Sequence, residues 1–192
     1  IVSILGDAVY GVDVPSLEAA AVDLLKARGM TLAVAESCTG GLLSKRITDI
    51  PGCSAVFPGG VCTYANSAKE RFLGVPGELL QQHGAVSEPV AAAMARGAAE
   101  AFGADLGIGI TGIAGPDGGT AEKPVGTVFV GFYTKDRAEV LRLTLGVRSR
   151  DMVRTLAASH ALNLVRKYLL NAVMSESAAL SEIAAGQART LS

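Results

Sequence analysis

The densest group of reactive side chains lies in residues 36–41, which read Glu-Ser-Cys-Thr-Gly-Gly. A carboxylate, two hydroxyls and a thiol precede two glycines there, and an apolar stretch with helical spacing follows. The first N–H groups of a helix have no partners within the helix, and the helix dipole favours an anion at that end. Such a segment can hold a phosphate or stabilise an oxyanion, with Ser37 or Thr39 as the nucleophile. The same hydroxyls can also simply cap the helix, so the segment alone leaves both possibilities open.

Tyr64 and Lys69 form a second candidate group, because Tyr64 ends an expected strand and Lys69 follows about one helical turn later. Both side chains can then reach the cleft above the strand ends. A lysine that is partly removed from water loses its proton more readily and can act as a general base. A solvated lysine beside a core tyrosine fits the same two residues, so the pattern alone does not decide.

Residues 112–126 are rich in glycine and proline and are too long for an ordinary connection, which favours ligand binding. No Lys-Ser or Lys-Thr pair follows the glycines, so the segment is not a P-loop. Gly107, Gly109 and Gly112 match the dinucleotide pattern GxGxxG, but no helical pattern follows, and we interpret the match as accidental. The loop can wrap a sugar or a phosphate, with Asp117 accepting from ribose hydroxyls; a tight structural turn is the alternative.

The remaining composition restricts the function classes. Three cysteines without CxxC spacing, and only two histidines, argue against a disulfide framework and against a metal site. A net charge of −1 and the absence of Trp argue against binding to nucleic acid or to a membrane surface. We see no run of about twenty apolar residues and no signal-peptide pattern. We therefore expect a reduced, cytoplasmic protein that needs no metal and no cofactor.

Strand and helix patterns alternate in the first part of the sequence, and a hairpin pattern follows in the second. Buried strands are expected at residues 31–35 and 105–111, a looser strand at 55–64 with a bend or bulge at its glycine pair, and an antiparallel pair at 127–134 and 140–145. Helical patterns cover residues 17–28, 42–50, 65–73, 88–102 and 149–170, and residues 74–84 contain a short helix that Gly84 ends. This order predicts an α/β fold, a three-layer α/β/α sandwich with a mixed, mostly parallel sheet.

The length of 192 residues and the apolar content suit one core. We expect a domain at residues 16–170, an N-terminal arm at residues 1–15, and a C-terminal tail rich in Ala and Ser at residues 171–192. The tail can pack on the surface, pack on a partner or remain mobile.

Four segments together resemble the CinA C-terminal domain family of competence/damage-inducible proteins, which is similar to stand-alone nicotinamide-nucleotide amidases. They occur in consistent order and read AESCTGG from residue 35, GGVCTYANSAKERFLGV from 59, HGAVSEPVAAAMARGA from 83 and GITGIAGPDGGTAEKPVGTVFVG from 109. The resemblance implies hydrolysis of nicotinamide mononucleotide, a small-molecule nucleotide, to nicotinate mononucleotide and ammonia in pyridine-nucleotide salvage. It also implies the sandwich fold and a homodimer or higher homo-oligomer.

The resemblance assigns Ser37 as the nucleophile and Tyr64 and Lys69 as its catalytic partners. A neutral Lys69 takes the proton of Ser37, and Tyr64 passes a proton to the leaving ammonia. Backbone N–H groups near Thr39, Gly40 and Gly41 are expected to stabilise the oxyanion. The phosphate is assigned to the second loop, with Asp117 on the ribose as an alternative, although the two loops can exchange these roles. The residues expected to bind substrate at that loop are Thr111, Gly112, Gly115, Asp117 and Gly118.

Glu36 keeps three possible roles, since it can orient Lys69, contact the amide nitrogen or cap the helix. The alternative function is a non-catalytic nucleotide-binding or regulatory module, because relatives of this domain are often fused to another domain. A structural oligomerisation domain is a third possibility, but it leaves the two glycine-rich loops unexplained. The complete set of Ser37, Tyr64 and Lys69 favours the enzyme.

Overall fold

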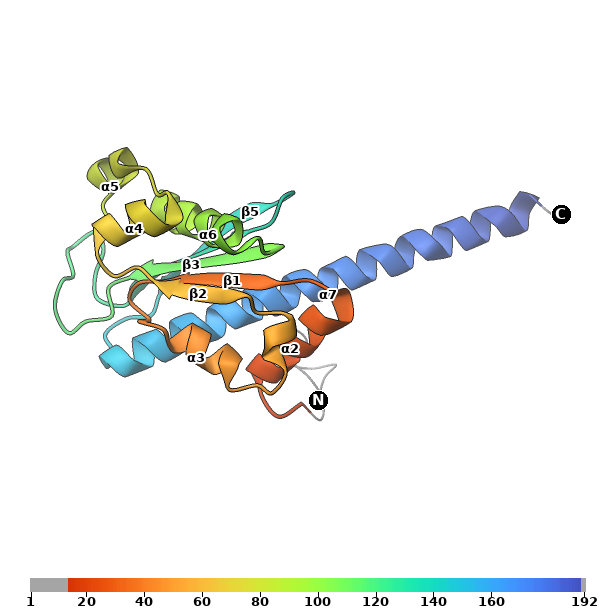
Figure 1. Cartoon of the computed structure of the whole chain (residues 1–192), viewed down its shortest axis with the longest axis horizontal. Coiled ribbons are helices and arrows are strands. Elements are labelled where there is room, and N and C mark those ends of the chain that lie inside the picture. Colours follow the sequence, from red (N-terminus) through yellow and green to blue (C-terminus); the bar gives the residue numbers. More distant parts are fainter. Residues whose placement is uncertain (1–13, 191–192) are drawn as a thin grey trace.

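A computed structural model describes residues 14–190 of the chain, and side chains up to residue 171. The N-terminal arm expected at residues 1–15 therefore lies almost wholly outside the described residues. The described chain forms one five-stranded sheet between two layers of helices (Figure 1). Across the sheet the strands are β2 (Gly59–Cys62), β1 (Leu32–Glu36), β3 (Leu106–Gly112), β4 (Thr127–Tyr133) and β5 (Ala138–Thr144).

The sheet is mixed, as the sequence predicts, but its parallel part is limited to three strands. Strand β1 pairs in parallel with both β2 and β3, whereas β3 with β4 and β4 with β5 are antiparallel. No crossover helix lies between β3 and β4, since the long glycine-rich loop joins them directly, and β5 follows β4 as a hairpin.

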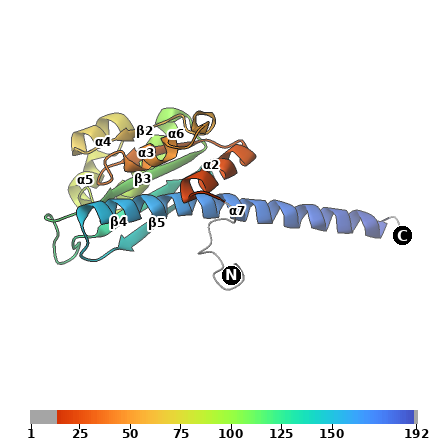
Figure 2. The ribbon, with the colours of Figure 1, turned by 90° about the horizontal axis from the view of Figure 1, so that it is seen from below.

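The helices divide between the two faces of the sheet (Figures 1 and 2). One layer contains α4 (Asn66–Leu73), α5 (Gly77–His83) and α6 (Glu88–Phe102), and the other contains α2 (Leu17–Arg28), α3 (Leu42–Thr48) and α7 (Arg150–Thr190). Each layer has its own core because successive strand residues point to opposite faces. Ala33 and Ala35 pack towards α6, whereas Val34 packs towards α2, α3 and α7.

The helix α7 includes the segment expected as a separate tail, because one helix continues from Arg150 to Thr190. Its second half projects away from the sandwich (Figures 1 and 2). Within the described part of the chain, we find no helix with the length and apolar character needed to cross a membrane.

The segment expected as a ten-residue strand is instead a 3-10 helix, η2 (Cys53–Ala55), followed by the short strand β2. The predicted bend at Gly59 and Gly60 is wrong, since both residues lie within β2. Side chains at these positions would overlap their neighbours: a Cβ atom at Gly59 would lie 2.4 Å from the Phe102 ring of α6. One at Gly60 would lie 2.6 Å from the Val34 side chain of β1 and 2.8 Å from Ser44 Oγ of α3. The glycines thus serve close packing.

The GxGxxG match in β3 has a packing origin, which supports its interpretation as accidental. A Cβ atom at Gly107 would lie 2.0 Å from the Ala95 carbonyl oxygen of α6, and one at Gly109 would lie 2.5 Å from the Ala91 carbonyl oxygen. The helix α6 can lie this close to the sheet only because β3 has no side chains at these two positions.

We expect the Gly107→Ala variant to lower the free energy of unfolding by about 3 kcal/mol, because the added methyl group overlaps the backbone of α6. Urea denaturation followed by circular dichroism measures this loss. The matched control is Gly103→Ala at the end of α6, where the backbone is left-handed and a Cβ atom meets no atom within 4 Å. That control carries only the cost of its positive φ, about 1 kcal/mol. Equal losses in both variants would contradict the close contact between α6 and β3.

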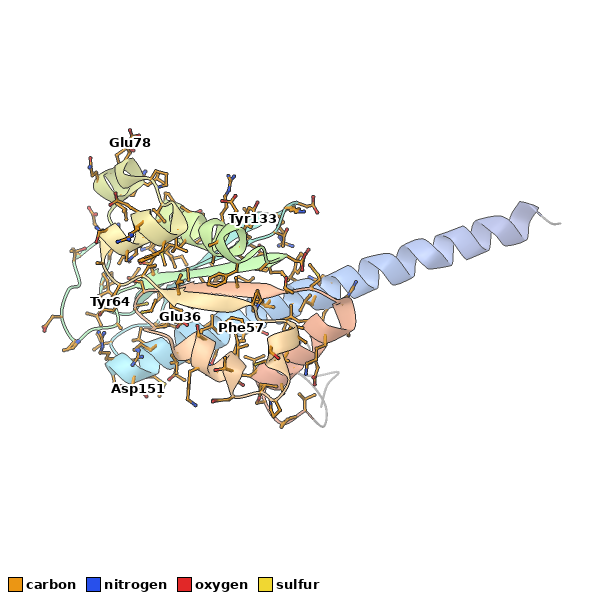
Figure 3. All side chains as sticks on the ribbon, viewed as in Figure 1. Glu36, Phe57, Tyr64, Glu78, Tyr133 and Asp151 are labelled. Atoms are coloured by element: carbon orange, nitrogen blue, oxygen red, sulfur yellow. The ribbon has the colours of Figure 1, made fainter. Side chains whose placement is uncertain are left out.

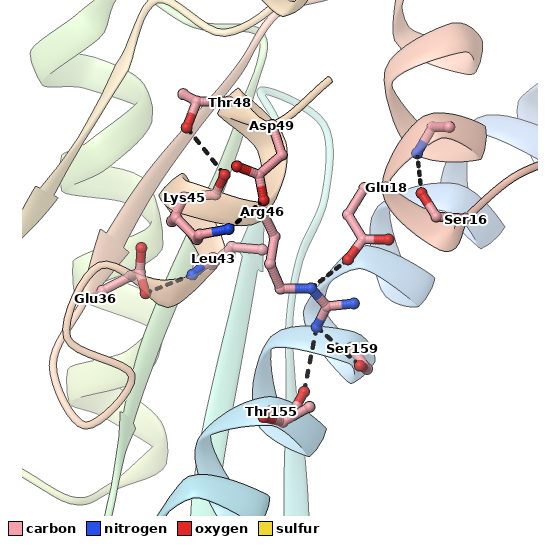
Figure 4. A network of polar contacts seen from close by, with 11 residues as sticks. Ser16, Glu18, Glu36, Leu43, Lys45, Arg46, Thr48, Asp49, Thr155 and Ser159 are labelled. Atoms are coloured by element: carbon pink, nitrogen blue, oxygen red, sulfur yellow. Dashed lines mark hydrogen bonds and ion pairs between the residues drawn. The ribbon is translucent and has the colours of Figure 1, made fainter. Parts of the chain in front are cut away.

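A polar network fixes α3 beneath the sheet (Figure 4). Arg46 of α3 forms a short ion pair with Glu18 of α2, and it also donates to Ser159 Oγ at 2.9 Å and to the Thr155 carbonyl at 3.3 Å. One guanidinium thereby joins α2, α3 and α7. The junction thus holds the last turn of α3, the helix that follows the reactive segment.

Candidate functional site

The reactive segments meet at one edge of the sheet. Strands β1 and β2 are parallel, with Glu36 opposite Cys62, and Glu36 also lies opposite Ile110 of the parallel strand β3. The segments that follow these three strands therefore leave from the same edge, which is where α/β sheets place their ligands. They carry Ser37, Tyr64 and the glycine-rich loop respectively.

Ser37 and Lys69 lie within hydrogen-bonding distance. Lys69 Nζ is 3.2 Å from Ser37 Oγ, although 32 residues separate them in sequence. Helix α4 carries Lys69 inward, so that only 1% of this residue is exposed. Its amine also contacts two carbonyl oxygens, those of Thr63 at 2.8 Å and Tyr64 at 3.2 Å. The solvated alternative for Lys69 is therefore wrong.

Either a neutral or a charged amine can make these three contacts. A neutral lysine has two N–H donors and one lone pair. The two donors can go to the carbonyls of Thr63 and Tyr64, which can only accept. In the charged form Lys69 donates to all three oxygens. In the neutral form its lone pair faces the hydroxyl hydrogen of Ser37, so that Ser37 donates and Lys69 accepts. This is the polarity that a general base needs.

Burial lowers the pKa of Lys69 below the usual lysine range, because the charged ammonium loses its hydration there. The thiols of Cys38 and Cys62 act in the opposite direction and more weakly. The carboxylate of Glu36 does not bond the amine, since both its oxygens are engaged at α3. The surroundings thus make the neutral form of Lys69 easier to reach than that of an exposed lysine.

Glu36 caps the helix that follows the reactive segment. Its carboxylate is fully buried and accepts from the Leu43 N–H at 2.9 Å and from the N–H and hydroxyl of Ser44 at 2.8 and 2.7 Å. Figure 4 shows the contact with Leu43. Of the three roles considered for Glu36, these contacts favour the cap. The hydroxyls of Ser37 and Thr39 are not needed for that purpose, since the N-cap residue of α3 is Gly41.

The turn after Ser37 leaves part of the expected oxyanion site available. The Gly40 N–H donates to the Ser37 carbonyl at 3.1 Å and is therefore engaged. Within the described chain, the N–H groups of Thr39 and Gly41 donate to no protein acceptor. Gly40 and Gly41 have φ values of +60° and +90°, which glycine adopts readily. Donation to an oxyanion by Thr39 and Gly41 stays a prediction.

The Tyr64 side chain lies outside the Ser37–Lys69 contact. Its ring is 62% exposed, and its hydroxyl accepts from Arg150 Nη2 at 3.0 Å. Figure 3 shows Tyr64 at the same end of the molecule as Asp151, which follows Arg150 in α7. Only the backbone carbonyl of Tyr64 contacts Lys69. Proton transfer by the Tyr64 hydroxyl stays a prediction.

The second loop is fixed at several points around the site. Thr111 is buried and donates its hydroxyl hydrogen to the Ala85 carbonyl at 2.8 Å, so this hydrogen is not available to a phosphate. The Gly115 carbonyl accepts from Arg150 Nη1 at 2.9 Å. Gly112 lies within β3, while Asp117 and Gly118 are exposed. The contacts of Thr111 are thus structural, and the other expected roles of this loop stay predictions.

Two arginines that sequence reasoning missed connect α7 to both loops. Arg150 bridges Tyr64 and Gly115, and Arg154 donates to the Thr39 carbonyl from Nε at 3.1 Å and from Nη2 at 2.7 Å. The sequence signal for these two arginines was their spacing of four residues at the start of a helix, directly after a polar loop, which puts both on one face of that helix.

Neither a reactive thiol nor a metal cluster is part of the described site. Burial raises the pKa of the Cys38 thiol to about 12, so the thiol is protonated at neutral pH and a poor nucleophile. No three His, Cys, Asp or Glu side chains among the described residues gather closely enough to hold a metal ion.

Comparisons with known proteins identify relatives of this chain. A CinA-like protein of Desulfovibrio desulfuricans is 54% identical over 167 residues, which are 86% of this chain and 39% of that protein. A CinA-like protein of Geotalea daltonii is 50% identical over 168 residues, 88% of this chain and 40% of that protein. The chain thus spans about two fifths of the length of these relatives.

Solved structures show the same fold. The crystal structure of the competence/damage inducible protein CihA from Agrobacterium tumefaciens matches with a TM-score of 0.77 and 37% identity, over 82% of this chain and 96% of that one. The family model of the CinA C-terminal domain matches residues 14–169. The chain belongs to the CinA C-terminal domain family.

Proposed function

We propose that this domain is an amidohydrolase that converts nicotinamide mononucleotide to nicotinate mononucleotide and ammonia. The observation that carries the proposal is the 3.2 Å contact between Ser37 Oγ and the buried amine of Lys69. A serine hydroxyl needs an adjacent base to attack an amide, and a neutral lysine without a carboxylate partner supplies one. The family resemblance supplies the substrate.

In the proposed reaction, Lys69 takes the hydroxyl proton of Ser37 while Oγ attacks the carboxamide carbon. The oxyanion of the tetrahedral intermediate accepts hydrogen bonds from the N–H groups of Thr39 and Gly41. A proton then passes to the amide nitrogen from Lys69 directly, or from Tyr64 as the resemblance implies, in which case the proton on Lys69 replaces that of Tyr64. Ammonia leaves, and Lys69 is neutral again on either route. Water, deprotonated by Lys69, hydrolyses the acyl-serine and releases nicotinate mononucleotide. The scheme uses only residues of this chain.

We place the substrate phosphate at Arg150. Its guanidinium has five N–H donors, and the described contacts with Gly115 and Tyr64 use two of them. The residue is exposed beside both loops, so its remaining donors are accessible to an anion. Arginine binds phosphate through charge-assisted hydrogen bonds, which supports this placement over the hydroxyl of Thr111.

The Arg150→Ala variant should raise the KM for nicotinamide mononucleotide about 10- to 100-fold, the usual effect of losing hydrogen bonds to a charged group. Steady-state kinetics with nicotinamide mononucleotide and nicotinamide riboside separate the phosphate contribution, because the riboside lacks the phosphate. The control is Arg148→Ala, an exposed arginine bonded to the Leu145 carbonyl. An equal loss with both substrates would show that Arg150 acts on the fold of the loops instead.

The proposed function is tested by incubating the purified chain with nicotinamide mononucleotide and measuring ammonia and nicotinate mononucleotide. We expect stoichiometric formation of both products, which persists in the presence of a metal chelator because the scheme requires no metal. Binding of the nucleotide without any turnover would contradict the proposal and support the non-catalytic module.

A further inference from the structure

Arg154 holds the turn that follows Ser37. The residue lies in the second turn of α7 and is partly buried. Two of its donors, Nε and Nη2, point to one acceptor, the Thr39 carbonyl oxygen, at 3.1 and 2.7 Å. In the described part of the chain, Arg154 has no carboxylate within ion-pair distance. Its charge therefore acts on a backbone group beside the proposed nucleophile.

The contact continues through the backbone to Ser37. The carbonyl that Arg154 bonds belongs to the same peptide group as the Gly40 N–H, which donates to the Ser37 carbonyl at 3.1 Å. Hydrogen bonds at both ends of one peptide group polarise it and strengthen each other. The Ser37 N–H donates to the Ile110 carbonyl at 2.9 Å. Both backbone polar groups of Ser37 are thus fixed, one by the sheet and one by the turn that Arg154 holds.

Gly40 makes this arrangement possible. A Cβ atom at Gly40 would lie 3.4 Å from Arg154 Nη2, and the φ of this residue is +60°. A Cβ atom there would thus be in ordinary contact with the guanidinium, and it is the left-handed φ that favours glycine at this position. The turn therefore has a left-handed residue at the point where the arginine reaches it.

We infer that Arg154 is a positioning residue for Ser37, and this inference rests on the proposed role of Ser37 as the attacking group. By fixing the peptide between Thr39 and Gly40, Arg154 keeps Ser37 Oγ against the Lys69 amine. It acts through the turn and does not bind the substrate phosphate, which is the role assigned to Arg150. Loss of Arg154 then lowers kcat and leaves KM nearly unchanged.

The experiment uses Arg154→Ala and Arg154→Lys, with Arg148→Ala as the matched control. In Arg154→Ala we expect kcat for nicotinamide mononucleotide to fall about 100-fold, the effect of a misplaced reacting group. Added guanidinium ion at millimolar concentration should restore at least part of this loss. Hydrogen exchange measured by mass spectrometry should accelerate in residues 37–42. Arg154→Lys keeps a cationic donor group, and its kcat should lie between those of wild type and Arg154→Ala. This variant preserves the test if the alanine variant does not fold.

A second readout does not depend on the natural substrate. Labelling of Ser37 by a fluorophosphonate probe, followed by intact mass, reports the reactivity of the hydroxyl, and we expect it to slow in parallel with kcat. If the wild-type chain is labelled but does not hydrolyse the nucleotide, the proposed substrate is refuted. The labelling rates of the Arg154 variants then still test the role of Arg154. Unlabelled wild-type chain would refute Ser37 as the nucleophile and the inference with it. Unchanged labelling in both variants, or a raised KM with unchanged kcat, would overturn the positioning role.

Discussion

Replacing Ser37 by alanine should lower kcat for nicotinamide mononucleotide by at least about 10⁴-fold, comparable to the loss of a serine nucleophile in other hydrolases. The variant keeps the backbone bonds of residue 37 to Ile110 and Gly40, so the turn should remain folded. Only the attacking atom and its contact with Lys69 Nζ are removed. Ammonia release under single-turnover conditions measures the loss, and thermal unfolding verifies that the fold is intact.

Two further hydroxyl variants make the assignment specific. Ser67→Ala removes an exposed hydroxyl on α4, two residues before Lys69, and should leave the rate unchanged. Thr39→Val removes the hydroxyl that was the alternative nucleophile; this oxygen is buried and has no hydrogen-bond partner among the described residues. If Thr39→Val abolished turnover and Ser37→Ala did not, the roles of the two hydroxyls would be reversed.

The elements that position the site were largely predictable because their signals are local. Ser16 accepts a hydrogen bond from the Ala19 N–H and begins α2, and Gly29 ends it with a φ of +59°. The apolar runs that became β1 and β3 were equally clear. At α6 the local signal is only partly realised: Ser87 is the N-cap residue, but its hydroxyl donates backward to the Gly84 carbonyl and makes no cap hydrogen bond.

The contacts of the site were less predictable because they join distant parts of the chain. Arg154 and Thr39 are 115 residues apart, and Arg150 and Tyr64 are 86 residues apart. An arginine in the first turns of an amphipathic helix is most often solvated, so sequence periodicity cannot distinguish these two from surface charges. Glu36 was ambiguous for a related reason, since its partners depend on how β1 and α3 meet. The pairing of Ser37 with Lys69 came from the family resemblance.

The pH dependence of the reaction should report the protonation of Lys69. A general base is active only when it is unprotonated, so kcat/KM should rise with pH through the pKa of Lys69 and level off above it. Because burial lowers that pKa, the rise should lie below the pH range of an ordinary lysine. The measurement is kcat/KM for nicotinamide mononucleotide over a range of pH in which the protein stays folded.

Replacing Lys69 by methionine, which has a similar shape and no amine, should remove this rise together with at least about 10³-fold of the rate. Lys45→Met is the control, since Lys45 is exposed and pairs with Asp49. It should preserve both the rate and the pH profile. If a neutral Lys69 amine takes the proton of Ser37, the Lys69→Met variant should stay inactive at every pH, while the kcat/KM of wild type rises with pH. If the variant kept the same rise at a lower rate, another group would be titrating. Lys69 would then serve only to hold the carbonyls of Thr63 and Tyr64, which are its other two contacts.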